Sequence, residues 1–569
     1  MKRKQRLVRM FALLLSMLLV LSACGGTSSA TQEASSATEV ESAEVSATSQ
    51  LAAAEPEVLP AEDVEESTAD APSAGVTYPV FDEMTTITAF LNMPSWASTY
   101  IGAGKAFENS KAILLAEEAT NVHLEMTISD PDTYNEQLNL MLASSDYADI
   151  IRDATRLFSS GADGLIEEEI CVDLMPYFEE YAPDYYALLE SNESFKNDVT
   201  SSSGTAVTMY SYTEIPQYSR GPVVRVDMLE AVDMEIPTTV DELYEVAVAL
   251  KNNGVEYPVV GPQFLTGAYD AATINSSGGS VEMTWLNIDG TIQPAIALDS
   301  MYEYVEVCRT FAAEGLFVED WYNPQPMYDS YMLSDRLAMC FGPYSITSDA
   351  TAATAAHPDT CVIYPMANVT VNEGDEIKSL DATIGGKGDG DWCITTAHPE
   401  YLTQIISYVN WFFTEEGSLV SNFGVEGEAF AYDENGEIQY TELVLNDPNG
   451  YGSMAVYAIY TNFNDNPFLY QYERTSLTYD NEIEATVYDT WLSNITGEYV
   501  VNVKLTTEET TRYNALATDV TTTIAENASK FIIGDLPLED WDAFIESMYD
   551  LGLDEMTEIY QAAYDRSIN

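Results

Sequence analysis

The sequence has very few of the side chains on which hydrolases and nucleotide-binding enzymes commonly depend. Only three histidines occur in 569 residues, His123, His357 and His398, and none belongs to an H-E-x-x-H sequence. A zinc hydrolase is therefore not indicated. The sequences G-x-S-x-G and G-x-x-x-x-G-K-[ST] are also absent, which argues against a nucleophile elbow and a phosphate-binding loop.

Basic residues are scarce as well. The chain has 22 Lys and Arg against 93 Asp and Glu, so its formal net charge is −71 at pH 7. A surface of this charge repels nucleic acid and anionic lipid, so neither is expected as a partner. A neutral or a cationic ligand remains compatible with it. Because carboxylates are so frequent, no single pair of them indicates a glycosidase.

Cysteine is limited to six residues, and Cys24 stands apart from the others near the N-terminus. The remaining cysteines are Cys171, Cys308, Cys340, Cys361 and Cys393. An odd number without a C-x-x-C pair does not indicate a disulfide framework. We expect each to be a small buried hydrophobic residue. A single disulfide bond between Cys340 and Cys361 is kept as an alternative.

The N-terminus has the pattern of a secretory signal peptide over residues 1–23. Five basic residues precede an apolar run from Met10 to Leu21, and small residues follow it. The run is shorter than the roughly 20 apolar residues that a membrane-spanning helix needs. Leu21-Ser22-Ala23-Cys24 resembles the lipobox of bacterial lipoproteins, where the cysteine receives a diacylglyceryl group and becomes the mature N-terminus. We therefore expect an exported chain with a lipid anchor at Cys24.

Residues 24–77 are expected to form a disordered acidic linker. From Gly25 to Gly75 the chain is mostly Ser, Ala, Thr, Glu and Val, without an aromatic residue. Such a segment buries too little apolar surface to offset its conformational entropy. Repulsion between its carboxylates extends it further, so the linker would hold the following domain away from the membrane.

Beyond the linker, strands and helices alternate. Thr85–Leu91 alternates apolar and polar residues as a strand does, Ala112–Thr120 is typical of a helix, and Val122–Ile128 of a second strand. A helical spacing over Tyr134–Ala143 then leads into a predicted strand at 148–151. This order predicts an α/β fold with a largely parallel sheet.

Several segments, taken in order, resemble family 1 extracellular solute-binding proteins, the lipoprotein receptors of ABC importers for oligosaccharides. The similar segments are Tyr134–Ala143 with Asp149-Ile150-Ile151, Asp173-Leu174 with Tyr181-Ala182-Pro183, Arg225-x-Asp227-Met228-Leu229, Ile236–Thr239 with Asp241-Glu242-Leu243, Ala338–Tyr344, Pro399–Phe413 with Glu415-Glu416-Gly417, and Phe531–Gly534 before Trp541 and Leu551-Gly552-Leu553. Each motif is short, but their order covers nearly all of residues 78–569.

The resemblance implies a two-lobed periplasmic-binding-protein-like fold, with a ligand cleft between two α/β lobes joined by crossing strands. Lobe one would comprise 78–212 plus 391–425, and lobe two 213–390 plus 426–569. The lobes would close on the ligand by a hinge motion. Where the family commonly carries Asp-Gly-Lys-x-Tyr-x-x-Pro, this chain has Ser203–Tyr210, which keeps the glycine and loses the charges. The polar contacts of that turn are therefore expected to differ.

Candidate ligand-binding residues follow from the chemistry of sugars, which present apolar C–H faces and a belt of hydroxyls to aromatic rings and short polar groups. Trp96 follows the first strand, where cleft loops of open α/β sheets lie. Tyr344 falls on the family's Gly-Pro-aromatic position, which stacks on sugar in family members. The other candidates are Trp285, Trp321, Asp391, Trp392 and Glu426.

Other conspicuous residues are assigned to structure. Trp411 and Trp541 lie in helical patterns and are expected in the core, and Arg225 is expected to pair with a nearby carboxylate. The glycine-rich segment 385–391 is interpreted as a mobile loop or hinge. Asp433-Glu434-Asn435-Gly436 begins like a calcium loop but lacks the later bidentate Glu, so a hairpin turn is favoured.

The sequence therefore predicts a non-enzymatic, monomeric carbohydrate receptor without a cofactor, anchored on the outer face of a Gram-positive cell membrane. Its partners would be an oligosaccharide and the permease subunits of an ABC transporter. Two alternatives stay open: a receptor of the same fold for a peptide or a cationic solute, and a surface-anchored glycoside hydrolase.

Overall fold

The computed structural model describes most of the chain from Gly75 onward. The described residues are 75–92, 107–158, 160–216, 220–269, 283–321, 328–348, 354, 356–357, 360–377, 384–448, 453–463, 466–479, 481–495 and 503–567. Residues 71–569 form one compact unit. The predicted signal peptide, Cys24, most of the linker and Trp96 lie outside the described residues.

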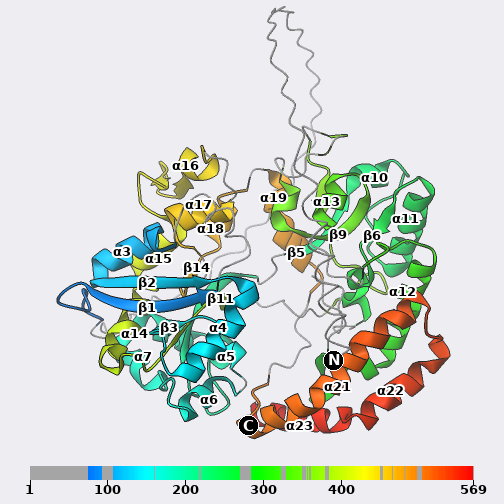
Figure 1. The fold of residues 1–569 in the computed structure, drawn as a ribbon. Coiled ribbons are helices and arrows are strands. Elements are labelled where there is room, and N and C mark those ends of the chain that lie inside the picture. The colour runs from blue at the N-terminus through cyan, green and yellow to red at the C-terminus, as the bar shows by residue number, and fades with distance from the viewer. Residues whose placement is uncertain are drawn as a thin grey trace, which may run out of the picture. The chain divides into compact units, whose positions relative to one another are not determined.

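The first sheet is built around the N-terminal strands and has six strands (Figure 1). In spatial order they are β14 (Leu469–Tyr470), β4 (Thr208–Pro216), β11 (Ile384–Ile394), β3 (Ile150–Ile151), β1 (Thr85–Asn92) and β2 (Val122–Ser129). β1 runs parallel to β2 and β3, whereas β11 runs antiparallel to β3 and β4. The sheet is therefore mixed rather than largely parallel as predicted.

The alternation predicted for the start of this sheet is confirmed. α3 (Lys111–Thr120) joins β1 to β2, and α4 (Pro131–Ser144) joins β2 to β3. Asp130 caps α4 by accepting the N–H of Asp132, and Pro131 occupies the first turn, where no intrahelical donor is required. These local signals explain why the first β–α–β–α–β segment could be predicted from sequence.

Further helices accompany the first sheet. They are α5 (Ala154–Leu157), α6 (Gly161–Glu167), α7 (Met175–Tyr181), α8 (Pro183–Ser191), α9 (Glu193–Val199), α14 (Leu402–Trp411) and α15 (Glu415–Phe423). The core of this region includes Phe178, Tyr185, Trp392, Ile406 and Trp411. Trp411 is 2% exposed, so its prediction as a core residue is confirmed.

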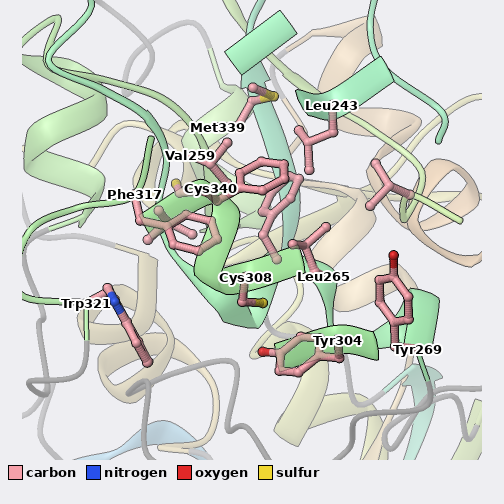
Figure 2. Close-up of a cluster of buried hydrophobic side chains, with 14 of the residues drawn as sticks. Leu243, Val259, Leu265, Tyr269, Tyr304, Cys308, Phe317, Trp321, Met339 and Cys340 are labelled. Carbon is pink, nitrogen blue, oxygen red and sulfur yellow. The ribbon is translucent and has the colours of Figure 1, made fainter. Parts of the chain in front are cut away.

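A second sheet has its own hydrophobic core, part of which Figure 2 shows. Its strands, in spatial order, are β10 (Ile363–Pro365), β5 (Arg220–Arg225), β9 (Leu337–Pro343) and β6 (Tyr257–Val259). Only β6 and β9 are parallel among these pairs. Trp541 belongs to this core and is 3% exposed, as predicted.

Several helices and a hairpin complete the region of the second sheet. They are α10 (Val226–Glu230), α11 (Val240–Asn252), β7 (Trp285–Ile288), β8 (Thr291–Pro294), α12 (Asp299–Ala313), α13 (Tyr328–Leu333), α19 (Glu482–Ala485), α20 (Val487–Leu492), α21 (Thr507–Ile533), α22 (Trp541–Asp550) and α23 (Leu553–Ser567). Arg225 Nη2 lies 2.6 Å from an oxygen of Asp227 and 2.8 Å from one of Asp335, so the predicted ion pair is confirmed. None of the helices in the described part of the chain has the length and apolar character of a membrane span.

Residues 423–477 pack with the first sheet. This segment contains β12 (Phe430–Tyr432), β13 (Ile438–Tyr440), α16 (Glu442–Leu445), α17 (Ser453–Tyr460) and α18 (Glu473–Ser476). Ala458, Phe463 and Phe468 enter the core of the first sheet, and β14 extends that sheet beside β4. This packing differs from the predicted division, which places the chain from 426 onward in lobe two. The favoured hairpin turn is present, because β12 and β13 pair across Asp433–Gly436.

The glycine-rich segment 385–391 forms part of β11, so its interpretation as a mobile loop is wrong. The strand is irregular, with a register shift between Lys387 and Asp391 opposite β4. Gly390 sits where other chain segments approach closely. A Cβ placed there would lie 2.3 Å from the carbonyl oxygen of Asn466 and 2.3 Å from Ser211 Oγ.

We expect Gly390→Ala to destabilise the protein, because the added methyl group meets a backbone carbonyl as well as the Ser211 side chain. Overpacking of this kind costs about 1–3 kcal/mol. Urea unfolding followed by tryptophan fluorescence measures the loss. Gly75→Ala is the matched control, since nothing lies within 4 Å of its Cβ position; equal stability of the two variants would contradict the close approach.

Candidate functional site

Tyrosine side chains gather around Tyr344, the residue at the family's Gly-Pro-aromatic position. Tyr344 opens a short 3-10 helix directly after β9. Its ring centroid lies 6.3 Å from that of Tyr479 and 6.2 Å from that of Tyr488, and Tyr472 lies 6.4 Å from Tyr488. With Tyr470, which interacts electrostatically with Tyr344, these residues form what we call the tyrosine cluster.

The tyrosine cluster offers both ring faces and hydroxyl groups. Tyr472 is 36% exposed, whereas Tyr488 is buried at 6%. Burial raises the pKa of Tyr344, the negative charge of Glu484 raises it further, and the Arg474 guanidinium opposes the rise. The phenol is therefore neutral at physiological pH, and a neutral phenol both donates and accepts hydrogen bonds.

Arg474 lies behind the tyrosine cluster and is fully buried. Its guanidinium carbon is 4.5 Å from the ring centroid of Tyr457 and 5.1 Å from that of Tyr470. Nη2 donates to Thr461 Oγ1 at 3.0 Å and to the carbonyl oxygen of Asn462 at 2.9 Å. Within the described parts of the chain, Nε and Nη1 have no hydrogen-bond partner. A fixed positive charge thus sits against aromatic faces, an arrangement that favours cation–π attraction.

A second polar region lies where β3 ends. Asp391 Oδ2 accepts the backbone N–H of Asp153 at 2.8 Å, and Asp391 Oδ1 lies 3.6 Å from Arg152 Nε. Arg156 Nε donates to Asp153 Oδ1 at 3.0 Å. Burial raises the pKa of Asp391 to about 7, with a further rise from the charge of Asp153 and an opposing effect of Arg152.

A cavity of about 430 Å³ adjoins this polar region, a volume within the range of small-molecule sites. Its lining combines two aromatic rings, several hydroxyl groups, an amide and charges of both signs. The lining residues are Thr155, Arg156, Phe158, Ser160, Gly161, Ala162, Asp163, Asp198, Val199, Thr200, Ser201, Ser202, Tyr210, Lys504, Leu505, Thr510 and Asn514.

Two charged residues of this cavity are held by hydroxyl groups. Asp163 accepts hydrogen bonds from Ser201, Ser203 and Thr205 at 2.6–2.8 Å; although burial raises its pKa, these bonds lower it below the usual value. Lys504 Nζ donates to Thr200 Oγ1 at 2.7 Å, and burial lowers its pKa. Ser203 and Thr205 belong to the turn that departs from the family pattern, so its polar contacts run to Asp163.

The predicted site residues lie in different surroundings. Tyr344 lies in the tyrosine cluster. Asp391 contacts Asp153, which in turn pairs with Arg156 of the cavity lining. Glu426 is exposed in the turn after α15. Trp96 lies outside the described residues. Their roles in ligand binding stay predictions.

The remaining predicted tryptophans are buried. Trp392 is 0% exposed and stacks on Tyr408 at 6.2 Å. Trp285 stacks on Tyr560 at 4.8 Å and donates its indole N–H to Tyr513. Trp321 lies in the core of the second sheet at 2% exposure (Figure 2). None of these rings presents a face to solvent in this conformation, so the polar cavity and the tyrosine cluster are the stronger candidates.

Most of the candidate site was not predicted from sequence. The tyrosines that join Tyr344 lie close together along the chain, at 470, 472, 479 and 488, and this local density was the available signal. Tyr210 and Lys504 of the cavity carry no comparable signal, because each is placed there by long-range packing.

The two sheets with separate cores form a two-lobed, periplasmic-binding-protein-like α/β fold, and solved structures share this fold. The alginate-binding protein AlgQ2, solved without calcium ion, is 20% identical, with a TM-score of 0.67 over 85% of this chain and 99% of that chain. An HMO-binding, ABC-transporter-associated solute-binding protein from Bifidobacterium longum infantis is 16% identical, with a TM-score of 0.66 and coverages of 85% and 99%. The S. pneumoniae substrate-binding protein FusA, in complex with kestose, is 15% identical, with a TM-score of 0.63 and the same coverages.

Residues 94–304 match the family described as bacterial extracellular solute-binding protein. This is the family that the ordered motifs predict, and the match covers part of the chain. No curated protein matches its sequence.

The raised pKa of Asp391 predicts a specific pH dependence of stability. Because the folded-state pKa of about 7 exceeds the ordinary 3.8, the folded protein binds more protons than the unfolded chain between these values. Stability contributed by this group is therefore full below about pH 4 and is lost as pH rises to about 7. The loss is about 2–4 kcal/mol.

Asp391→Asn removes this titration while an amide oxygen can still accept the N–H of Asp153. Urea unfolding of both proteins at several pH values measures the difference, which should grow in favour of the variant as the pH rises. A pH-independent difference would show that Asp391 titrates normally.

Proposed function

We propose that this protein is an extracellular receptor that captures an oligosaccharide and delivers it to the permease of an ABC transporter. The tyrosine cluster is the observation that carries the proposal. It combines ring faces for the apolar faces of sugar rings with phenol groups for their hydroxyls. Proteins of the same fold that bind alginate, HMO and kestose support the same ligand class.

The polar cavity near β3 suits the same ligand. Its hydroxyl, amide and charged groups match the dense belt of donors and acceptors around a sugar, and Tyr210 and Phe158 add ring faces. Side chains already oriented by hydrogen bonds, such as Asp163 and Lys504, lose little freedom when a ligand binds. We propose this cavity and the tyrosine cluster as two regions of ligand contact.

The remaining elements of the proposal concern location and partners. We propose a diacyl anchor at Cys24 on the outer face of a Gram-positive membrane, a monomeric receptor, and an acidic linker between anchor and receptor. Binding and release, without a chemical step, are its function. The family is one of extracellular binding proteins, which supports this division of roles between receptor and permease.

Tyr344→Ala tests the ligand class. Isothermal titration against a panel of neutral and uronic-acid oligosaccharides should give a Kd for the native protein and a Kd weaker by about tenfold or more for the variant, since a stacked ring contributes roughly 1–2 kcal/mol. Tyr344→Phe keeps the aromatic ring and should lose less ligand affinity than Tyr344→Ala. Tyr432→Ala is the matched control, because Tyr432 is 47% exposed on the β12–β13 hairpin.

Other outcomes of the titration separate the alternatives. Absence of heat and of a thermal shift with every saccharide would overturn the carbohydrate assignment. Binding of a cationic solute with an affinity that falls steeply with salt would favour the receptor for a charged ligand. Release of new reducing ends from the same panel would identify a hydrolase.

Cys24→Ala tests the anchor. The native protein should sediment with membranes, because a diacyl anchor supplies the roughly two acyl chains that stable attachment requires. The variant should appear in the medium as a folded, ligand-competent protein, and uptake of the ligand should fall. Uptake that persists undiminished with the variant in the medium would show that attachment is not required.

A further inference from the structure

Two cysteines from distant parts of the sequence meet inside the first sheet. Cys171 follows α6 and forms an isolated bridge with Thr395, and Cys393 lies in β11. Their Sγ atoms are 3.4 Å apart, although 222 positions separate them along the chain. Both side chains are almost fully buried, at 2% and 0% exposure.

The surroundings of the pair are apolar. Phe90, Ile151, Leu165 and Val207 belong to the same buried cluster. Among the residues that the structure describes, no group of three or more His, Cys, Asp and Glu side chains gathers in a way that would hold a metal ion. Metal binding therefore does not account for two thiols at this distance.

The other cysteines have different neighbours. Cys340 Sγ lies 3.9 Å from Met332 Sδ, and Cys361 Sγ donates to the carbonyl oxygen of Thr347 at 3.0 Å. Cys340 lies in β9, and Cys361 precedes β10, which β5 separates from β9. The bridge between Cys340 and Cys361 that the sequence left open is not formed. All five described cysteines are buried.

We propose that Cys171 and Cys393 form a disulfide bond in the exported protein. The Sγ atoms need to approach by only about 1.4 Å to reach bonding distance, which rotation about the side-chain bonds supplies. Extracellular compartments allow such bonds to persist. The proposal rests on the export of the chain and is independent of the ligand.

A low-molecular-weight disulfide such as oxidised glutathione is the oxidant. The thiolate of one cysteine attacks a glutathione sulfur, forming a mixed disulfide and releasing one glutathione thiolate. The second cysteine, after losing its proton, attacks the protein sulfur of that mixed disulfide and releases the other glutathione. Two electrons pass from the cysteine pair to the oxidant, and two protons leave the cysteine thiols.

Burial decides when the bond forms and how long it lasts. The buried thiols are inaccessible in the folded protein, so exchange occurs while β11 joins the sheet during folding. Once formed, the bond is shielded from reductants until the protein unfolds. It would link the two sequence segments that flank the second sheet, and a link across so long a loop restricts the unfolded chain strongly.

Differential alkylation of the mature full-length protein tests the proposal. The protein is collected from the cell surface without reductant and treated with N-ethylmaleimide in denaturant. A parallel sample is reduced, refolded with oxidised glutathione and treated in the same way. We expect two of the five described cysteines to resist alkylation unless the denatured protein is first reduced. Peptide mass spectrometry without reduction should detect the peptides of Cys171 and Cys393 as one disulfide-linked species.

Variants provide the controls. Cys171→Ser should leave Cys393 reactive, whereas Cys340→Ala should leave the bridge intact. Reductant should lower the midpoint of thermal unfolding of the native protein and leave that of Cys171→Ser unchanged. Alkylation of all five cysteines in both unreduced samples, or a bridge between any other pair, would overturn the proposal; these readouts on the native protein do not depend on the folding of a variant.

Discussion

The antiparallel pairing of β11 with β3 and β4 is the constraint on which the rest of the first sheet depends. It brings residues 384–394 into a sheet in which β1, β2, β3 and β4 begin some 170–300 positions earlier along the chain, whereas β14 begins later. This pairing sets Asp391 beside Asp153 and Cys393 beside Cys171. Because successive side chains of a strand point to opposite faces, it also turns Trp392 into the core. One ladder of backbone hydrogen bonds thus fixes a polar contact, a thiol contact and a core residue together.

Basic residues are scarce in this chain, and the buried arginines Arg225 and Arg474 are stabilised in different ways. Arg225 is held by two carboxylates and the carbonyl oxygen of Met332. Arg474 instead lies among the rings of Tyr457, Phe468 and Tyr470. An unpaired charge in an apolar interior is costly in free energy. The aromatic faces and two oxygen acceptors around Arg474 therefore stabilise its charge, as the carboxylates do for Arg225. The charge in turn acts on Tyr344, which makes Arg474 an electrostatic element of the tyrosine cluster.

Features that depend on interactions local in sequence could be predicted, whereas features that depend on long-range pairing could not. The segment from β1 to β3 was predictable because its alternation, caps and helical spacing are local. Asp391 and Trp392 were both predicted as ligand-binding residues, but neighbouring residues in the sequence cannot decide which face of their strand is buried. The packing of residues 423–477 with the first sheet was not predictable for a related reason, since β14 joins that sheet through long-range pairing with β4.

The candidate site shows the same limit. The position of Tyr344 was predictable from a short motif, whereas its tyrosine neighbours come from a segment more than 120 residues later. Lys504 reaches the polar cavity only because the start of α21 lies near the 198–202 segment. Neither arrangement has a periodicity that would reveal it, and Asp391 alone gives no sign of the cavity that adjoins it.

The edge-on contact between Tyr488 and Trp491 has a consequence for observing the protein at work. The two ring centroids are 5.9 Å apart, and the indole is anchored by a hydrogen bond to the carbonyl oxygen of Pro222. Excitation absorbed by the tyrosines around Tyr344 can pass over these distances to a single rigid indole. Trp491 is thereby an intrinsic optical reporter for that surface, and its emission offers a label-free signal when a solute displaces the rings.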